Sequence, residues 1–240
     1  MSNEHGKELA EVALDIRAIK LNPDDPFQWA SGYRMPIYND NRLFLGSYEY
    51  REIIANGFLD LIEDEGIEWR RIAGTSTAGI SPATTLADLT GAPLIYVRDK
   101  PKDHGLRNRI EGIDSESDLE GEKIILIEDL ISTGGSSASA VQAIRDANGV
   151  CDYCLSIFNY GLDKAERVFR GEEAFDRDGN KLSFPCNVRS LLDYETLLEV
   201  AVESAYIDEE QVRMLNEWRA DPFGWGEKNG FPRIEKVGGN

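Results

Sequence analysis

Two adjacent acids and a loop of hydroxyl and glycine residues form the segment of this chain that is best suited to chemistry. The apolar run Ile124 to Ile127 is followed at once by Glu128 and Asp129, and then by small residues at 132–137. The acids can accept hydrogen bonds from sugar hydroxyls, and the loop amides and the start of a helix can bind phosphate oxygens. The pattern therefore predicts a sugar-phosphate site where a buried strand ends.

A plain strand–turn–helix junction is the alternative interpretation, because Gly and Ser are common in such turns. Gly134 and Gly135 are not followed by Lys and then Ser or Thr, so the loop is not a P-loop, and the sequence Gly-x-Gly-x-x-Gly is absent. The paired acids and the four hydroxyls of the loop nevertheless favour a ligand site. These hydroxyls belong to Ser132, Thr133, Ser136 and Ser137.

The segment 124–137 resembles the phosphoribosyl pyrophosphate (PRPP) binding motif of the type I phosphoribosyltransferase family. Three further segments, in the family's order, resemble the members of that family that act on orotate. They cover residues 27–42, 74–80 and 96–105. The third contains Lys102-Asp103-His104-Gly105, the most specific element of the resemblance.

The resemblance implies the type I phosphoribosyltransferase fold, an α/β fold with a central, mostly parallel sheet flanked by helices and a small N-terminal hood. Strand and helix patterns that alternate along the chain favour the same architecture. We expect an N-terminal helix and hood over the base site at 1–45, a phosphoribosyltransferase core at 46–205, and a C-terminal helix and tail at 206–240. Residues after 220 are Gly-rich and poorly patterned, which indicates a surface tail.

Hydrophobic periodicity and capping residues predict the elements that position the loops. The predicted strands cover residues 71–74, 94–97, 123–128 and 151–159. The predicted helices cover residues 6–20, 47–66, 80–89, 137–147, 162–170, 191–202 and 208–219. Residues 99–120 show no sustained periodicity, and so long a loop in a compact domain is usually functional or disordered.

The resemblance implies that the 5-phosphoribosyl group passes from PRPP to orotate, giving orotidine 5′-monophosphate and pyrophosphate in de novo pyrimidine (UMP) biosynthesis. It also implies Mg²⁺, held mainly by PRPP and water with no direct protein ligand. Lys102, His104 and Asp129 are the implied catalytic residues. Two alternatives stay open: a type I phosphoribosyltransferase for another nucleobase, and a non-catalytic regulator that senses PRPP.

The resemblance also assigns the binding residues. Those implied to bind PRPP are Arg98, Lys102, His104, Glu128, Asp129, Leu130, Ile131, Ser132, Thr133, Gly134, Gly135 and Ser136. The implied pyrophosphate loop consists of Thr75, Ser76, Thr77, Ala78 and Gly79. Those implied to bind orotate are Ser132, Tyr38, Asn39 and Arg42. Adjacent strand residues point to opposite faces, so Asp129 is better placed than Glu128 to reach the ligand.

The chain departs from the family pattern at three places. Ala30 stands where many members have Lys before Ser-Gly, and Asp99 replaces a common second cation after Arg98. The segment 158–161 lacks the Arg that binds the orotate carboxylate in many members. Arg42 and backbone amides of the hood are candidates to replace it, and the choice between them stays open.

Composition limits the partners of this protein. The 240-residue chain has a net charge of −18 from 44 acids and 26 bases, which disfavours nucleic-acid binding and suggests a salt-tolerant source. Its cations gather at 98–109, where an anionic substrate would need them. No signal peptide or membrane-spanning stretch is evident, so we expect a cytoplasmic protein without membrane contact. The resemblance implies a homodimer that shares the 99–110 loop between subunits.

The three cysteines give little sign of redox or metal chemistry. Cys151 and Cys154 have a C-x-x-C spacing, but there is no second pair and Cys186 stands alone in the sequence. The flanking residues read as a strand rather than a helix start. We therefore expect these thiols to be structural.

Overall fold

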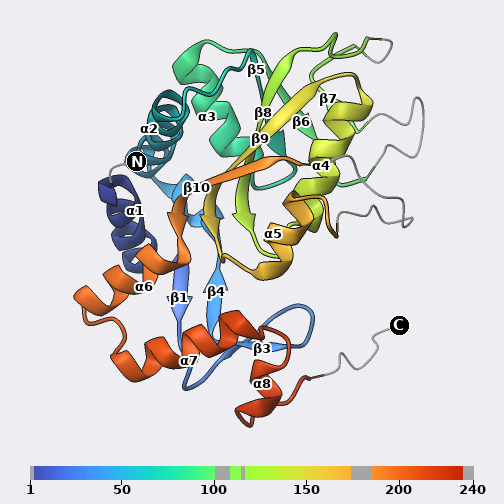
Figure 1. Ribbon diagram of the computed structural model, residues 1–240. Helices are drawn as coiled ribbons and strands as arrows, with labels where there is room; N and C mark the ends of the chain where they lie inside the picture. Colours follow the sequence, from blue (N-terminus) through green and yellow to red (C-terminus); the bar gives the residue numbers. More distant parts are fainter. Residues whose placement is uncertain (1–2, 101–108, 115–116, 174–184, 235–240) are drawn as a thin grey trace.

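The computed structural model describes residues 3–100, 109–114, 117–173 and 185–234, and its centre is a six-stranded sheet (Figure 1). The strands lie in the order β10, β9, β8, β5, β6, β7. Their bounds are Arg71–Thr75 for β5, Leu94–Val97 for β6, Ile110–Glu111 for β7, Lys123–Ile131 for β8, Val150–Asn159 for β9 and Asn187–Asp193 for β10. Every neighbouring pair is parallel except β6 and β7. The predicted α/β fold with a mostly parallel sheet is confirmed.

Helices cover both faces of this sheet (Figure 1). One face packs against α1 (Asn3–Asp15), α2 (Tyr48–Asp64) and α3 (Ile80–Thr90), and the other against α4 (Gly135–Asp146) and α5 (Asp163–Phe169). The helix α6 (Tyr194–Glu203) lies against α1.

Side-chain alternation along β8 explains why both faces are covered. Ile125 and Ile127 join the hydrophobic cluster on the α1–α3 side, whereas Ile124 and Leu126 join the cluster on the α4–α5 side. A strand that is apolar on both faces must be buried on both, which is the expected condition of a central parallel strand.

The hood is a small unit at the carboxyl ends of the strands. Its strands form two antiparallel pairs, and a 3-10 helix, η1, leads from them into α2. The bounds are Ile19–Leu21 for β1, Phe27–Gln28 for β2, Arg34–Met35 for β3, Ile37–Asn39 for β4 and Asn41–Gly46 for η1. The helices α7 (Glu209–Ala220) and α8 (Trp225–Lys228) pack against the hood, so segments far apart in the sequence form one layer (Figure 1).

Three predicted boundaries are wrong, and each error concerns a strand. The N-terminal helix α1 ends at Asp15 rather than at residue 20, because Arg17 has a φ of +59° and Ile19–Leu21 form the strand β1. The strand β8 does not end at residue 128 but continues to Ile131, so Asp129 lies inside it as well as Glu128. A helix is predicted from residue 191, but residues 187–193 form the edge strand β10. The helix α6 begins only after Asp193, whose side chain caps it by accepting a 2.8 Å hydrogen bond from Thr196 N.

The prediction of a surface tail after residue 220 is only partly right. The segment lies at the surface but is anchored to the hood as far as it is described. Trp225 is 1% exposed, and the amide of Ile234 donates a 3.0 Å hydrogen bond to Gly32 O. A single buried aromatic residue produces no periodic pattern, so the sequence alone did not indicate this contact.

The three cysteines are buried and free, and the structure brings them together in the cluster beside α4 and α5. A β-bulge in β9 opposite Ile124 places two residues against one, so Cys151 and Cys154 face the same side despite their spacing. Burial raises the pKa of the Cys154 thiol, which keeps it in the unreactive protonated form. Within the described residues, no group of His, Cys, Asp or Glu side chains could hold a metal ion.

No helix in the described part of the chain is both long enough and apolar enough to cross a bilayer.

Candidate active site

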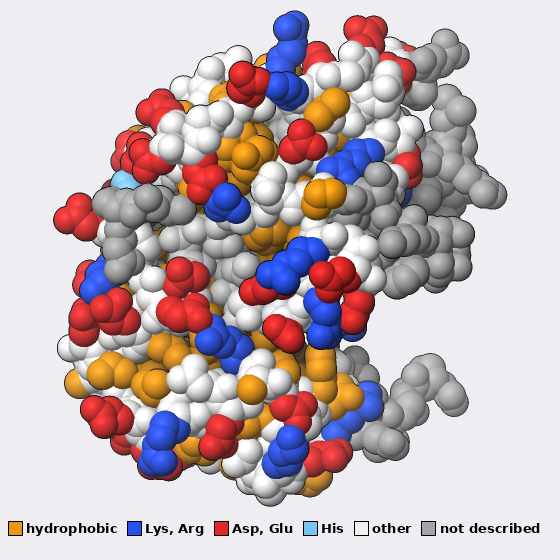
Figure 2. Space-filling view, in the orientation of Figure 1, with side chains coloured by type: hydrophobic (Ala, Val, Ile, Leu, Met, Phe, Trp, Pro, Cys, Tyr) orange, Lys and Arg blue, Asp and Glu red, His pale blue; other side chains and the backbone are white. Residues whose placement is uncertain are grey.

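An open pocket lies where β5, β6 and β8 end, and most of the predicted phosphate-binding residues line it. The lining residues are Thr75, Ser76, Thr77, Ala78, Val97, Arg98, Asp99, Arg109, Glu128, Asp129, Leu130, Ser132, Ser136 and Ala140. The space-filling view shows the surface hollowed between the sheet layer and the unit formed by the hood, α7 and α8 (Figure 2). Three loops that are distant in the sequence thus meet at one edge of the sheet, as open α/β sheets require for ligand binding.

The carboxylate of Glu128 is engaged by the protein rather than directed at a ligand. Its Oε1 accepts hydrogen bonds from Thr75 Oγ1 at 2.6 Å and from Asp129 N at 3.1 Å, and its Oε2 accepts one from Ser137 Oγ at 2.8 Å. Burial raises the pKa of Glu128 to about 7, although the hydrogen bond from Thr75 opposes the rise. Glu128 therefore joins the end of β5 to the first turn of α4.

The carboxylate of Asp129 is half-buried at the pocket wall. Burial raises the pKa of Asp129, and hydrogen bonding with Glu128 and with the backbone amides of Asp129 and Leu130 opposes the rise more than the positive charge of Arg42 does. The backbone carbonyl of Asp129 accepts a 2.6 Å hydrogen bond from Asn41 Nδ2, which connects the hood to β8. Of the two acids, Asp129 is the more exposed at the pocket, in line with the expectation from side-chain alternation.

The loop after β8 leads directly into α4, whose first turn borders the pocket through Ser136. Gly134 has φ of +78°, and a Cβ there would lie 3.1 Å from the Phe169 ring, so this turn requires glycine. Ser132 and Ser136 line the pocket. The 12-residue helix α4 thus presents free N–H groups and a positive dipole end to an anion. Ile131 is fully buried in the core, so only its backbone could contact a ligand.

The loop from Thr75 to Gly79 forms the opposite wall and is tightly packed. The peptide bond between Ser76 and Thr77 is cis. Ser76 N donates to Val97 O at 2.9 Å, whereas the amides of Thr77 and Ala78 have no acceptor among the described residues. The amide of Gly79 likewise has no acceptor among the described residues, so the backbone amides of this loop can bind phosphate oxygens.

Cations of the β6 end complete the pocket. Arg98 Nη1 lies 3.4 Å from Glu111 Oε1, and its backbone pairs with Arg109. The guanidinium of Arg109 donates to the carbonyl and hydroxyl oxygens of Ser139, at 3.0 and 2.9 Å. The predicted catalytic residues Lys102 and His104 lie outside the described residues, so their roles stay predictions.

The residues predicted to bind orotate belong to the hood side, except for Ser132. Asn39 Nδ2 donates to Asn41 Oδ1 at 2.9 Å. Arg42 forms a two-pronged ion pair with Asp40, at 2.6 and 2.8 Å, and this hydrogen bonding lowers the pKa of Asp40. Arg42 is therefore already paired with a carboxylate.

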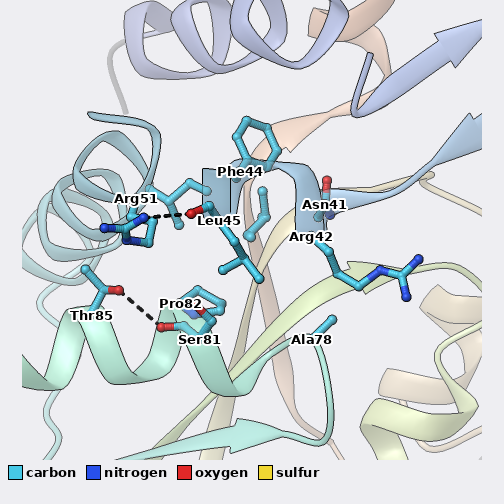
Figure 3. Close-up of a pocket in the computed structure, with 11 residues that line it drawn as sticks. Asn41, Arg42, Phe44, Leu45, Arg51, Ala78, Ser81, Pro82 and Thr85 are labelled. Carbon is cyan, nitrogen blue, oxygen red and sulfur yellow. Dashed lines mark hydrogen bonds between the residues drawn. The ribbon is translucent and has the colours of Figure 1, made fainter. Parts of the chain in front are cut away.

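A second pocket lies beside Arg42 and Ala78, between η1, α2 and α3 (Figure 3). Its walls are mostly apolar, and Arg42 extends away from Phe44 and Leu45 rather than into it. Arg51 donates to Leu45 O at 2.7 Å and is used to hold η1 in place. Ala78 is its only lining residue from the loop 75–79, and neither the loop 132–136 nor the two acids line it, so the first pocket is the better candidate for a sugar phosphate.

Two structural links of the site were not predicted. One is the position of Glu128 between Thr75 and Ser137, and the other is the bond from Asn41 to Asp129. Asn41 is 4% exposed, and a buried amide must find partners. Its place between the two predicted orotate ligands Asn39 and Arg42 is the signal that could have revealed it.

The chain is similar to known proteins along more than nine tenths of its length. No family model matches it. The orotate phosphoribosyltransferase of Listeria monocytogenes serotype 4b (strain F2365) is 42% identical over 221 residues, 92% of this chain and 98% of that protein. That of Cytophaga hutchinsonii is 41% identical over 219 residues, 91% of this chain and 97% of that protein. The crystal structure of orotate phosphoribosyltransferase from Aeropyrum pernix aligns with a TM-score of 0.64 at 23% identity, covering 83% of this chain and 99% of that one, which supports the fold.

Proposed function

The chain belongs to the orotate phosphoribosyltransferase family, and on this premise we propose how its residues bind the substrates and carry out the transfer. The enzyme transfers the 5-phosphoribosyl group from PRPP to orotate, giving orotidine 5′-monophosphate and pyrophosphate in de novo pyrimidine biosynthesis. The relatives' names favour this reaction over transfer to another base and over a regulatory role. The observation that carries the proposed substrate positions is the convergence of the two loops and Asp129 on one pocket.

PRPP would lie across this pocket with its two charged ends on opposite walls. The 5-phosphate fits the loop 132–136, where the start of α4 supplies amides and a favourable dipole. The pyrophosphate fits the amides of Thr77 and Ala78, with Arg98 at the end of β6 as a countercharge. Asp129 is then the side chain that accepts hydrogen bonds from the ribose hydroxyls between them.

The charges that develop during the transfer define what these groups must stabilise. As N1 of orotate attacks C1 of the ribose, positive charge develops on the sugar and extra negative charge develops on the leaving pyrophosphate. Donors fixed before the reaction stabilise that charge without having to reorganise. Asp129 would favour the cationic sugar, and the amides of Thr77 and Ala78 would favour the leaving group. Lys102 and His104 are proposed to add charge and donors at the pyrophosphate when the 99–110 loop covers it, which also excludes water.

Mg²⁺ is the proposed cofactor, and the donor set of the pocket fits a weakly anchored ion. The described residues contain no cluster of three or more metal-ligating side chains, and the oxygens of Glu128 already accept hydrogen bonds from the protein. Asp129 is the carboxylate that could hold a metal-bound water. When bound, Mg²⁺ would disperse the charge of the pyrophosphate while PRPP and water supply most of its ligands.

The first experiment mixes the purified protein with PRPP, orotate and Mg²⁺, at low and at molar salt, and follows orotate absorbance. We expect loss of orotate that requires both PRPP and Mg²⁺. For Lys102→Ala we expect kcat to fall by roughly 10²-fold, the range seen when a donor to transition-state charge is lost. Absence of orotate loss at either salt concentration would contradict the proposed reaction, and wild-type turnover of Lys102→Ala would remove Lys102 from the mechanism.

A homodimer that shares the 99–110 loop is the second part of the proposal. Apolar side chains exposed on η1, α2 and α3 support a subunit contact there; they are Leu43, Leu45, Tyr48 and Leu89. Subunits that carry Lys102→Ala can be mixed with subunits that carry Asp129→Asn. If the loop acts in the other subunit's site, each hybrid dimer contains one site with both wild-type residues. Random exchange should then restore about one quarter of the wild-type sites. Two inactive parents that stay inactive after exchange, with hybrids shown by mass spectrometry, would contradict loop sharing.

A further inference from the structure

Orotate differs from the other pyrimidine bases in carrying a carboxylate on its ring, and a site that selects it needs a positive charge for that group. Burying an uncompensated carboxylate is costly, so the counter-ion should be a cation that can reach the base site and has no strong partner of its own. The choice of this cation rests on the proposed function.

The strand pair β1–β4 of the hood places a lysine in such a position. Lys20 lies between Ile19 and Leu21, which are buried, so its side chain is on the opposite face of the strand. It pairs directly with Tyr38, one of the predicted orotate ligands. The Lys20 Nζ lies 5.4 Å from the centroid of the Tyr38 ring, within the range of a cation–π contact. The ring thus holds the ammonium without neutralising it.

Electrostatic effects connect this face of the hood to the pocket. The positive charge of Lys20 helps to lower the pKa of Asp40, although Arg42 is the main cause. The pKa of Asp129 is raised by burial, and the charge of Arg42 is the smallest of the effects that oppose this rise. Tyr38 and Asp129 both influence the buried Tyr160, whose pKa is raised mainly by burial. Lys20 therefore lies beside Tyr38 and close enough to Asp40 for their charges to interact.

The other described cations near this space are engaged by the protein. Arg42 is held by both oxygens of Asp40, Arg98 lies near Glu111, and Arg109 donates to Ser139. In the described part of the chain, no carboxylate lies within ion-pair distance of Lys20 Nζ, and its contact is with the Tyr38 ring. A lysine ammonium on a flexible stem can move a short distance to a bound anion, which a guanidinium locked in a two-pronged ion pair cannot do without breaking that pair.

We propose that the Lys20 ammonium binds the carboxylate of orotate and thereby makes the base site selective for a carboxylated pyrimidine. Tyr38 acts as a positioning residue, because its ring holds the ammonium on the pocket side of β1. Arg42 keeps Asp40 away from Lys20 by pairing with it, which leaves the charge of Lys20 for the ligand.

The test compares orotate with orotamide, in which an uncharged carboxamide replaces the carboxylate. Calorimetry in the presence of Mg²⁺ and pyrophosphate gives the dissociation constants of both compounds for wild type, Lys20→Gln and Lys20→Arg. We expect wild type to prefer orotate by about tenfold or more, the order expected for one charge-assisted contact. Lys20→Gln should lose this preference while binding orotamide as wild type does, and Lys20→Arg should keep most of it.

Lys123→Gln serves as the matched control, because Lys123 is exposed, pairs with Glu68 and lies at the opposite end of the sheet. It should leave the preference unchanged, and a melting temperature close to that of wild type shows that each variant is folded. A wild-type preference near one, or a Lys20→Gln variant that retains the wild-type preference, would overturn the proposal. Loss of the preference in Arg42→Gln but not in Lys20→Gln would assign the role to Arg42 instead. Turnover of orotate by wild type is measured separately, so failure of the proposed reaction remains distinguishable from failure of the role of Lys20.

Discussion

Thr75 Oγ1 donates a 2.6 Å hydrogen bond to Glu128 Oε1, and this bond ties the end of β5 to the neighbouring parallel strand β8 at the candidate pocket. The same carboxylate accepts a bond from Ser137 in α4. One buried acid thus fixes the relative positions of the two loops that are proposed to hold the ends of PRPP. The ionised form of this acid lowers the stability of the fold, because burial raises the pKa of Glu128 from 4.5 to about 7.

That raised pKa predicts a pH dependence of stability that can be assigned to one residue. An acid with a raised pKa in the folded state destabilises the fold in its ionised form. The cost is absent below pH 4.5, grows as the pH rises towards 7 and is fully present above about 7. Relative to Glu128→Gln, wild type should lose on the order of 3 kcal/mol of unfolding free energy over this interval, from roughly 1.4 kcal/mol per pKa unit. Urea denaturation of both proteins from pH 4 to 8 measures the difference.

The control for this experiment is Glu172→Gln, because Glu172 is exposed on the surface. Its pH profile should follow that of wild type. If Glu128→Gln shows the same slope as wild type between pH 4.5 and 7, the ionised carboxylate of Glu128 does not carry the cost assigned to it.

A second prediction concerns the close packing of the loop from Thr75 to Gly79. A Cβ on Gly79 would lie 2.3 Å from Thr75 Oγ1 and 2.6 Å from Ile127 O, so Gly79→Ala must displace the backbone of the loop. We expect kcat/KM for PRPP to fall by roughly tenfold or more, since small misplacements of binding groups are costly. Gly46→Ala is the matched control, because a Cβ at Gly46 meets nothing within 4 Å. Steady-state kinetics of the two variants with PRPP test this prediction, and equal values of kcat/KM would show that the loop tolerates the shift.

The elements of this fold that could be predicted are those with a clear hydrophobic periodicity within the element itself. The strand β6 has the predicted bounds, 94–97, and α3 exceeds its prediction by one residue. The end of β8 could not be predicted from hydrophobicity, because the strand continues through two acids whose partners come from β5 and from α4. The strand β10 was missed because its leucines fit equally well into the helical pattern that follows. Asp193 as a helix cap is the local signal that separates the two elements.

The site was predictable to the extent that contiguous segments form it. The loop 132–136 and the loop 75–79 were found by their residue types and their resemblance to a family, and the structure places them around one pocket. The contacts that connect these segments depend on packing between distant residues. The bond from Asn41 to Asp129 spans 88 positions, and although the neighbours Asn39 and Arg42 mark Asn41 as a site residue, no pattern in the sequence identifies its partner.

This bond leads to a third prediction, about the coupling of the hood to the sheet. Asn41 donates to Asp129 O at 2.6 Å and accepts from Asn39 at 2.9 Å. Asn41→Ala should lower the unfolding free energy by about 1–3 kcal/mol, because it leaves buried polar groups without partners. It should also raise KM for orotate more than KM for PRPP, since the hood side of the pocket loses its connection to β8. Urea denaturation and kinetics with each substrate in turn measure both effects, and an equal rise of the two KM values would argue against a specific role of the hood.

The last prediction concerns Trp225, which anchors the segment after α7 to the hood. Its ring is 1% exposed and stacks on Phe231 with centroids 5.9 Å apart, while its Nε1 has no hydrogen-bond acceptor among the described residues. Trp225→Ala should lower the unfolding free energy by about 3–5 kcal/mol, as expected for loss of a buried aromatic residue. Trp225→Phe should cost much less, because it keeps an aromatic ring and removes the unpaired N–H. Urea denaturation of both variants tests whether Trp225→Ala lowers the unfolding free energy more than Trp225→Phe does. Phe223→Ala is the control, because Phe223 is half-exposed, and it should lower the unfolding free energy by less than Trp225→Ala. An alanine variant as stable as the phenylalanine variant would show that Trp225 does not anchor the segment.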